Sequence, residues 1–270
     1  MKKYTKILFI CIAGLLYHYT VNADTVISVN GELYRNNYGE TISLDKIAKY
    51  IISLETTNGE PILQPVKDSY TTKQIGYGHQ ITPKENFTFI NEGQAMFLLK
   101  EDIIKVFMIL YQQEYETERV IFDVEKRYIK DIVLRKPPIE KIKIEKYNER
   151  YIDNFTEDQL IALISLGYNV GKNIFLENRS SYLEIMKNWQ HGEKEKNGKI
   201  YSCHDILKQF EGFFLQYSYA SIKSKVKKKN KGLSHRRKVE FKTFSKGFCE
   251  SIGQKIVNNY ILKKPLDNNN

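Results

Sequence analysis

The sequence predicts an α+β protein that is mainly helical, and three observations support this prediction. Apolar residues recur at helical spacing from Leu44 to Leu54, and again in a longer segment that starts at Glu92. The stretch 160–166 is apolar nearly all round, which is typical of a buried helix. Between the first two segments, two glycines flank an aromatic residue in Gly76-Tyr77-Gly78, a pattern that favours a tightly turned hairpin.

Length and charge limit the classes of partner. The chain has 270 residues, 41% of them hydrophobic, so it can bury a sizeable core as one large domain or as two lobes. Its formal net charge is +10, which favours an acidic partner such as nucleic acid, anionic lipid or the anionic polymers of a bacterial cell wall.

The first 23 residues have the anatomy of a secretory signal peptide. Lysines at positions 2, 3 and 6 precede an apolar run, Ile7 to Tyr17, and Val21-Asn22-Ala23 is a small-residue cleavage site. Removing this segment takes away three lysines and no acid, so the net charge falls from +10 to +7. We therefore predict a secreted or periplasmic protein with no stable membrane span after cleavage, an uncleaved anchor being the alternative. Because exported proteins seldom meet nucleic acid, the cell wall is the leading partner.

Cysteine and histidine usage suggests a disulfide rather than a metal site. Cleavage leaves Cys203 and Cys249, which can close one disulfide in an exported chain, although the sequence does not show that they are close in space. The remaining histidines are scattered and no Cys-x-x-Cys is present, so we predict no metal site.

The chain divides into a signal peptide (1–23), a polar extended N-terminal arm (24–40), a main domain (41–262) and a flexible tail (263–270). Ser43 is the predicted cap of the first helix, which ends at Glu55. Residues 67–78 are predicted to form a hairpin. The charged stretch 113–150 is predicted to be a peripheral helical insertion with a solvated face, broken at Pro137-Pro138.

Further helices are predicted towards the C-terminus. They are a buried helix after the cap-like stretch 155–159, a short helix around Tyr182–Met186, a Phe-rich helix over 203–219 and a helix through Val239 and Phe244. The lysine run 223–231 is expected to be a solvated face, which in a wall-acting protein also lengthens its residence on anionic polymer.

Four blocks, taken in order, resemble the phage-type lysozymes, the muramidases of glycoside hydrolase family 24. They are Ile52-Ser53-Leu54-Glu55, the hairpin Gln74-Ile75-Gly76-Tyr77-Gly78-His79, the stretch 162–171 ending in Gly167-Tyr168-Asn169-Val170-Gly171, and the stretch 232–240 beginning Gly232-Leu233-Ser234-His235-Arg236-Arg237. The resemblance extends over roughly Leu44 to Phe248. Each block alone is modest, but all four in one order make chance agreement improbable.

The resemblance implies a lysozyme-like fold: a small hairpin lobe, a long connecting helix, a helical lobe, and a groove between the lobes that binds peptidoglycan. It implies cleavage of the β-1,4 bond between N-acetylmuramic acid and N-acetylglucosamine, without a cofactor. Glu55 would be the general acid, and Asp68 would hold or activate the attacking water. Gly76, Tyr77 and Asn169 are candidate substrate contacts, and the alternative for Asn169 is to cap the end of its helix.

Two departures from the family pattern concern the catalytic groups. Glu55 and Asp68 lie thirteen positions apart rather than nine, and Glu60 is a rival for the acid, although it lies in a Pro-flanked loop. Gln74 occupies a position where the family usually has Thr, so we include it among the catalytic candidates, with Thr72 as a substitute. Altered chemistry or loss of activity is one consequence of this change.

Other roles follow from position. We predict an ion pair between His79 and Asp102, because Asp102 lies on the face of the long helix that packs against the hairpin and Glu101 points about 100° away. An exposed His79 is the alternative. Arg236 and Arg237 are predicted to be structural or surface charges.

Two functions compete with the muramidase prediction. A lytic transglycosylase would use one acid and no water-positioning Asp, and a wall-binding protein without catalysis would bind peptidoglycan only. An inhibitor or immunity protein is kept as a further candidate partner that the sequence cannot name.

Overall fold

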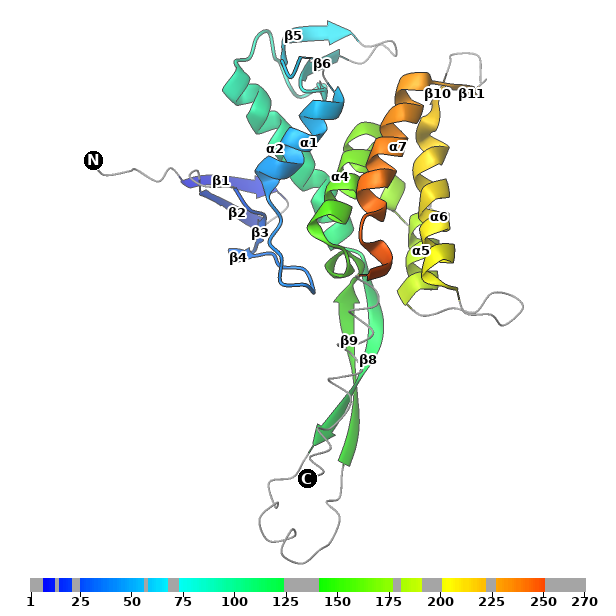
Figure 1. Ribbon diagram of the computed structural model, residues 1–270. Coiled ribbons are helices and arrows are strands. Elements are labelled where there is room, and N and C mark those ends of the chain that lie inside the picture. The colour runs from blue at the N-terminus through cyan, green and yellow to red at the C-terminus, as the bar shows by residue number, and fades with distance from the viewer. Residues whose placement is uncertain are drawn as a thin grey trace, which may run out of the picture.

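The computed structural model of the chain describes residues 7–12, 15–20, 25–55, 58–67, 73–123, 141–176, 181–190, 201–221 and 227–250. In these ranges the protein is mainly helical, with small antiparallel sheets of two or three strands (Figure 1). The fold is therefore of the α+β, mainly α class. Two strands, β1 (Ile7–Ile12) and β2 (Leu15–Thr20), pair within the predicted signal peptide, whose role in export stays a prediction.

The N-terminal arm is part of the folded body. It contains strands β3 (Ser28–Val29) and β4 (Glu32–Leu33), which pair antiparallel. Tyr34 is buried, and its hydroxyl donates to Asp153 Oδ1 at 2.9 Å, while Asn37 N donates to Asp153 O at 2.8 Å. The arm is thus fastened to the residues just before helix α4, whereas the sequence predicted only an extended polar segment.

The hairpin lobe consists of helix α1, a small sheet and the start of helix α2. Helix α1 (Leu44–Glu55) begins after Ser43, whose Oγ accepts a hydrogen bond from Lys46 N at 3.1 Å. Strands β5 (Ile62–Lys67), β6 (Lys73–Gly76) and β7 (His79–Gln80) form one antiparallel sheet. Helix α2 (Glu92–Tyr111) follows, with a capping box formed by Asn91 and Gln94.

Gly76 lies where the sheet packs against α2. Its φ is +66°, which glycine adopts without strain, and a Cβ added to it would lie 3.4 Å from Ala95 Cβ. The sheet therefore packs directly on α2, and α2 then runs from this lobe into the helical lobe (Figure 1).

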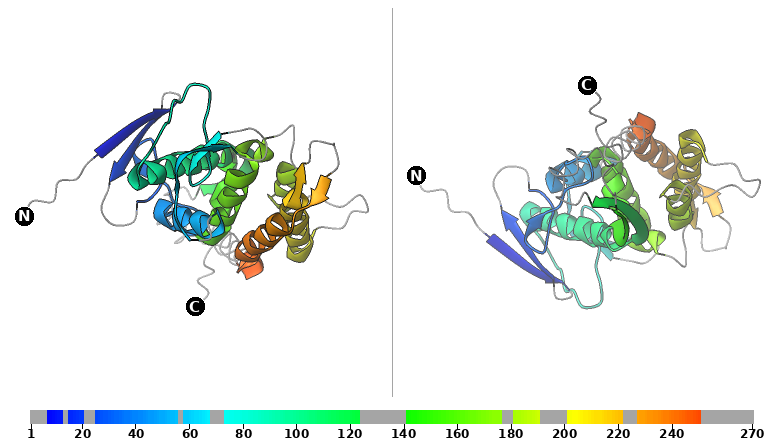
Figure 2. Two further views of the ribbon diagram at one scale, coloured as in Figure 1. Left: turned by 90° about the horizontal axis from the view of Figure 1, so that it is seen from above. Right: turned by 90° about the horizontal axis from the view of Figure 1, so that it is seen from below.

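The helical lobe is built around helix α4 (Glu157–Val170), which has a capping box at Thr156 and is buried from Gln159 to Gly167. The surrounding elements are η1 (Tyr151–Asn154), η2 (Lys172–Phe175), α5 (Ser181–Gln190), α6 (Cys203–Leu215), η3 (Gln216–Ser218), β10 (Tyr219–Ser221), β11 (Lys227–Lys229) and α7 (Lys231–Ser245). Figure 2 shows α4 between α1 and α2 on one side and α6 and α7 on the other. The nearly all-apolar sequence of α4 is explained by this central position.

An aromatic cluster and a disulfide hold α5, α6 and α7 together. The rings of Phe210 and Phe244 lie 4.6 Å apart, and Phe248 contacts both Phe244 and Trp189. Cys203, at the start of α6, is bonded to Cys249, just after α7, with their Cα atoms 5.7 Å apart. The disulfide that the sequence left open is therefore present.

The helical prediction for 113–150 is wrong in its two described parts, 114–123 and 141–150. Strands β8 (Glu114–Asp123) and β9 (Lys141–Arg150) form an antiparallel hairpin that projects away from the helices (Figure 1). Sequence such as Lys141-Ile142-Lys143-Ile144 alternates polar and β-branched residues, which favours a strand over a helix. Residues 124–140, with Pro137-Pro138, lie outside the described ranges, as do residues 251–270, which include the predicted tail.

A membrane-spanning helix has to be both long and apolar. None of the helices in the described ranges combines the length and the apolar composition required to cross a bilayer.

Candidate active site

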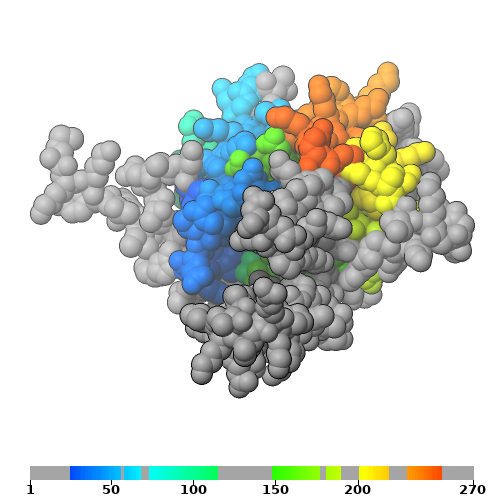
Figure 3. Space-filling view, turned by 60° about the horizontal axis from the view of Figure 1, so that its bottom comes forward, coloured from blue at the N-terminus to red at the C-terminus, as the bar shows by residue number. Residues whose placement is uncertain are grey.

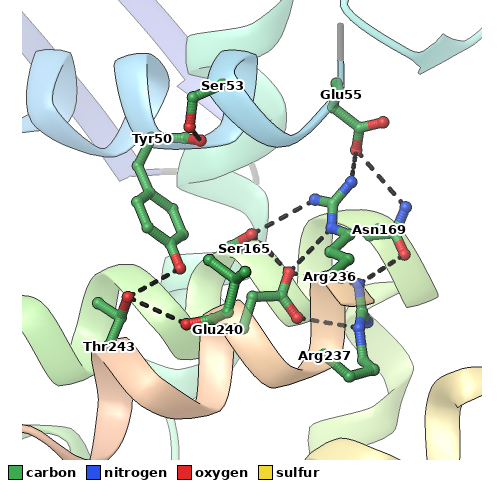
Figure 4. Close-up of polar contacts among 10 residues, drawn as sticks. Tyr50, Ser53, Glu55, Ser165, Asn169, Arg236, Arg237, Glu240 and Thr243 are labelled. Carbon is green, nitrogen blue, oxygen red and sulfur yellow. Dashed lines mark hydrogen bonds and ion pairs between the residues drawn. The ribbon is translucent and has the colours of Figure 1, made fainter. Parts of the chain in front are cut away.

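Glu55 is the last residue of α1, and its side chain is 21% exposed. Arg236 Nη1, from α7, donates to Glu55 Oε1 at 2.5 Å, and Asn169 Nδ2, from α4, reaches the same oxygen at 3.5 Å (Figure 4). Three helices that are distant in sequence thus meet at one carboxyl group. Both contacts end on Oε1, and among the described residues no side chain is hydrogen-bonded to the other oxygen, Oε2.

Arg236 is held in place by groups on two helices. Its side chain is 7% exposed, its Nε donates to Glu240 Oε1 at 2.9 Å, and its Nη2 donates to Ser165 Oγ at 3.3 Å. Ser165 Oγ in turn donates to Glu240 Oε1 at 2.7 Å. Burial lowers the pKa of Arg236, but the Glu55 and Glu240 carboxylates outweigh it and raise the pKa overall. A permanent positive charge therefore lies beside Glu55.

Arg237 fixes the orientation of Asn169. The guanidinium is fully buried, its Nη2 donates to Asn169 Oδ1 at 2.8 Å, and its Nε lies 2.9 Å from Glu240 Oε2 as an ion pair. With Oδ1 engaged by Arg237, the amide nitrogen of Asn169 is directed at Glu55. Burial lowers the pKa of Arg237 to about 10, against the effect of Glu240, so Arg237 stays charged at neutral pH. Both side chains are buried in this cluster, so neither arginine is a surface charge.

The hairpin is joined to α4 by a hydrogen bond from Tyr168. The hydroxyl of Tyr168 donates to the carbonyl of Tyr77 at 2.9 Å. The side chain of Tyr77 is itself only 8% exposed, and Gln74 lies half-buried on β6, opposite Val66 and Gln80. Substrate contact by Gly76, Tyr77 and Asn169 stays a proposal.

Of the two other candidate acids, Asp68 and Glu60, the structure describes only Glu60. Asp68 lies outside the described residues, together with Thr72, so the separation between Asp68 and Glu55 is not defined. Glu60 is exposed in the loop between α1 and β5. The contrast between an exposed loop acid and a half-buried, hydrogen-bonded helix-end acid favours Glu55 as the functional carboxyl.

His79 and Asp102 lie in contact, as the sequence predicts. His79 Nδ1 is 2.7 Å from Asp102 Oδ2, and the side chain is only 5% exposed. A second carboxylate that the sequence analysis missed, Glu85, lies 3.3 Å from His79 Nε2, and Lys105 Nζ lies 2.8 Å from Asp102 Oδ1. The hydrogen bond to Asp102 raises the pKa of His79 despite burial, and the pKa of Asp102 is lowered by His79 and Lys105 although burial opposes this.

Sequence reasoning also missed the roles of Ser165, Tyr168 and Glu240. The spacing of Glu240 from Arg236 and Arg237, four and three residues, places all three on one side of a helix and is the pattern that indicates their pairing. Nothing local to Ser165 or Tyr168 indicates their partners, which lie on other elements. No cluster of His, Cys, Asp or Glu suited to a metal ion occurs in the described parts of the chain.

The fold and the site together define a mainly helical protein with a half-buried carboxyl group, Glu55, at a helix end beside the guanidinium group of Arg236. No family profile matches the sequence, and no curated protein matches it. Among solved structures, the chain is similar to an endolysin from Escherichia coli O157:H7 phage FAHEc1, at 19% identity and a TM-score of 0.44, covering 74% of this chain and 90% of that one. It is also similar to the muramidase domain of SpmX from Asticaccaulis excentricus, at 15% identity and a TM-score of 0.42, covering 74% of this chain and 95% of the domain.

Proposed function

We propose that the protein is an exported peptidoglycan hydrolase that cleaves the β-1,4 bond between N-acetylmuramic acid and N-acetylglucosamine. The single observation that supports this most is the setting of Glu55. One of its oxygens is engaged by Arg236 and Asn169, while the group stays 21% exposed, so the carboxyl group is both held in one orientation and accessible to a substrate.

In this mechanism Glu55 acts as the general acid. Its Oε2 gives a proton to the glycosidic oxygen as the bond from that oxygen to the anomeric carbon breaks. Water attacks the anomeric carbon from the opposite face and becomes the new hydroxyl group, after Asp68 has accepted its proton. Arg236 stabilises the Glu55 carboxylate that remains, because charge-assisted hydrogen bonds are among the stronger ones.

Substrate contacts in the proposal come from the hairpin and from α4. Gly76 and Tyr77 are largely buried, so in the proposal they would shape the hairpin that borders the glycan, and Asn169 would reach the sugar bound nearest Glu55. Gln74 would contact the attacking water in place of the family's Thr, and a longer amide side chain there would position that water differently. The net positive charge of the chain suits an anionic wall substrate.

The test is Glu55→Gln, which removes the acidic proton and keeps the size of the side chain. We expect the rate of wall hydrolysis to fall by about 10²–10⁴-fold or more, while sedimentation with purified peptidoglycan is unchanged. The matched control, Glu60→Gln, removes a nearby exposed acid and should keep wild-type activity. Full activity in Glu55→Gln together with its loss in Glu60→Gln would reverse the assignment.

Mass spectrometry of the digested wall separates the hydrolase from its alternatives. Hydrolysis leaves reducing muramic acid ends, because water supplies the new hydroxyl group. Products ending in anhydro sugars would instead show a transglycosylase. Sedimentation of the wild-type protein with the wall, without any soluble product, would show a binding protein without catalysis.

A further inference from the structure

We propose that the exposed face of α7 binds a linear phosphodiester polymer through a line of lysines, separately from the candidate active site. We call Lys231, Lys238, Lys242 and Lys246 the basic stripe. All four are exposed, and Figure 3 shows α7 at the surface between α1 and α6. The inference goes beyond hydrolysis, because the stripe would bind polymer whether or not a glycosidic bond is cleaved.

Helical geometry places the stripe on one side of α7. At 100° per residue the three lysines within α7, Lys231, Lys238 and Lys242, fall within an arc of about 40° and extend over about 16 Å along the helix. Lys246 is the C-cap, one residue beyond the last helical residue. The buried residues Arg236, Arg237, Glu240 and Phe244 occupy the opposite side. One side of α7 thus supports the candidate active site, and the other presents charge to the outside.

The charge pattern of α7 differs from that of an ordinary solvated helix. The only acid in α7 is Glu240, which is fully buried, so its exposed side carries a single sign of charge. On α5 the exposed residues Glu184 and Lys187 alternate in sign, as do Lys208 and Glu211 on α6. Surface charges of both signs are the usual arrangement on a soluble protein, so an unmixed row indicates an anionic partner.

Without a bound anion, the charges of the stripe are expected to destabilise helix α7. Lys238 and Lys242 are four residues apart within α7, a spacing at which like charges on a helix repel. Lys231 lies in the first turn, at the positive end of the helix dipole, and that turn has no acid. Within the described residues only Lys246 has an anionic partner, Asp158 at 3.4 Å. A bound polyanion would relieve this repulsion.

The chemistry of the stripe favours a phosphodiester polymer. The neighbouring apolar residues Val239 and Phe241 are partly buried, so α7, as far as it is described, offers no exposed aromatic ring for stacking nucleobases and no apolar face for insertion into lipid. Lysine is a point charge that suits phosphate and does not need a fixed planar partner. Successive charges lie about 6–10 Å apart along the helix, a spacing that a short-repeat polyol phosphate chain can follow.

The experiment measures binding of a fluorescein-labelled glycerol-phosphate oligomer, long enough to span the stripe, by fluorescence anisotropy. The triple variant Lys231→Gln, Lys238→Gln and Lys242→Gln should bind at least about tenfold more weakly, and its salt dependence, log K against log salt, should be shallower by about 2. The matched control Lys84→Gln, Lys172→Gln and Lys187→Gln removes three exposed lysines elsewhere. It should stay within about twofold of the wild-type protein.

Equal loss in the two triple variants would show that net charge alone drives binding, and would overturn the proposal. Tighter, stripe-dependent binding to poly-glutamate or to phosphatidylglycerol vesicles would overturn the choice of polymer. The triple Lys→Arg variant at the stripe should retain binding.

If the Gln variant does not fold, acetylation of the lysines of the wild-type protein tests the proposal instead. The bound oligomer should protect the stripe lysines from acetylation and leave Lys84 and Lys172 reactive. Binding by Glu55→Gln should equal wild-type binding, so this test is independent of hydrolysis.

Discussion

At the scale of single residues, the candidate acid depends on charges that are themselves buried. Glu240 is fully buried and contacts both Arg236 and Arg237, and burial raises its pKa against the effect of these two guanidinium groups. Removing one member of a buried ion pair leaves the other uncompensated, which is far costlier than losing a surface pair. The position of Glu55 therefore depends on this buried cluster, and substituting any single member of the cluster is expected to destabilise it.

His79 provides the clearest pH-dependent prediction. Its environment comprises Asp102, Glu85, Glu101 and Lys105, and the net effect raises the pKa of His79 and lowers that of Asp102. A raised His pKa gives stability that is complete below the unfolded value of about 6.5 and is lost as pH rises through the folded value. A lowered Asp pKa gives stability that is lost in strong acid. The pair should therefore stabilise the fold most in mildly acidic solution.

We expect His79→Asn to destabilise the protein by about 1.5–3 kcal/mol near pH 5 and by clearly less near pH 9. At pH 5 the protonated ring forms an ion pair with Asp102, whereas at pH 9 the neutral ring keeps only a hydrogen bond to it. Thermal unfolding at both pH values measures this. The control His204→Asn removes an exposed histidine on α6 and should show no such difference. An equal loss at both pH values for His79→Asn would mean that the ring acts as a neutral hydrogen-bonding group.

At the scale of elements, Gly167 allows α4 to pack closely against its neighbours. A Cβ at this position would lie 2.5 Å from a ring carbon of Phe175 and 2.7 Å from a methyl group of Val106, on α2. Such distances are shorter than contact, so the elements would have to move apart. The close packing of α4 against α2, where the two lobes meet, therefore requires a residue without a side chain at position 167.

Gly167→Ala should lower the free energy of unfolding by about 1–3 kcal/mol, the usual cost of overpacking a core. The matched control is Gly212→Ala on α6, where an added Cβ meets nothing within 4 Å. That change should stabilise the protein by about 0.5–1 kcal/mol, because alanine favours a helix more than glycine does. Urea unfolding of both variants gives the comparison, and equal effects would show that the junction adapts to the extra methyl group.

At the scale of the whole molecule, the disulfide joins the start of α6 to the end of α7 across 46 residues. A loop of this length is expected to contribute about 4 kcal/mol by restricting the unfolded chain. Reductant should therefore lower the stability of the wild-type protein by about that amount. A Cys203→Ser, Cys249→Ser variant should be equally unstable and unaffected by reductant. Unchanged wild-type stability in reductant, with both thiols shown to be free, would contradict this.

Several features were predictable because they depend on neighbouring residues. Helical periodicity and capping identified α1, α2, α4 and α7, since hydrogen bonds and caps act within a few residues. Helix geometry then selected Asp102 over Glu101 as the partner of His79. The helical interpretation of 113–150 failed because a high charge content obscured the two-residue alternation, and the cross-strand pairs that stabilise β8 and β9 bring together residues up to 36 apart.

The sequence by itself thus determined the class of fold, most helices and the acid at the end of α1. Only the tertiary structure decided what surrounds that acid. Arg236 lies 181 positions from Glu55, and Asn169 lies 114 positions from it. Two further contacts belong to the same group: the disulfide between Cys203 and Cys249, and the hydrogen bond that joins Tyr34 of the N-terminal arm to Asp153 of η1. Contacts over such separations are set by how apolar faces pack together, and a local pattern of residues does not contain that information.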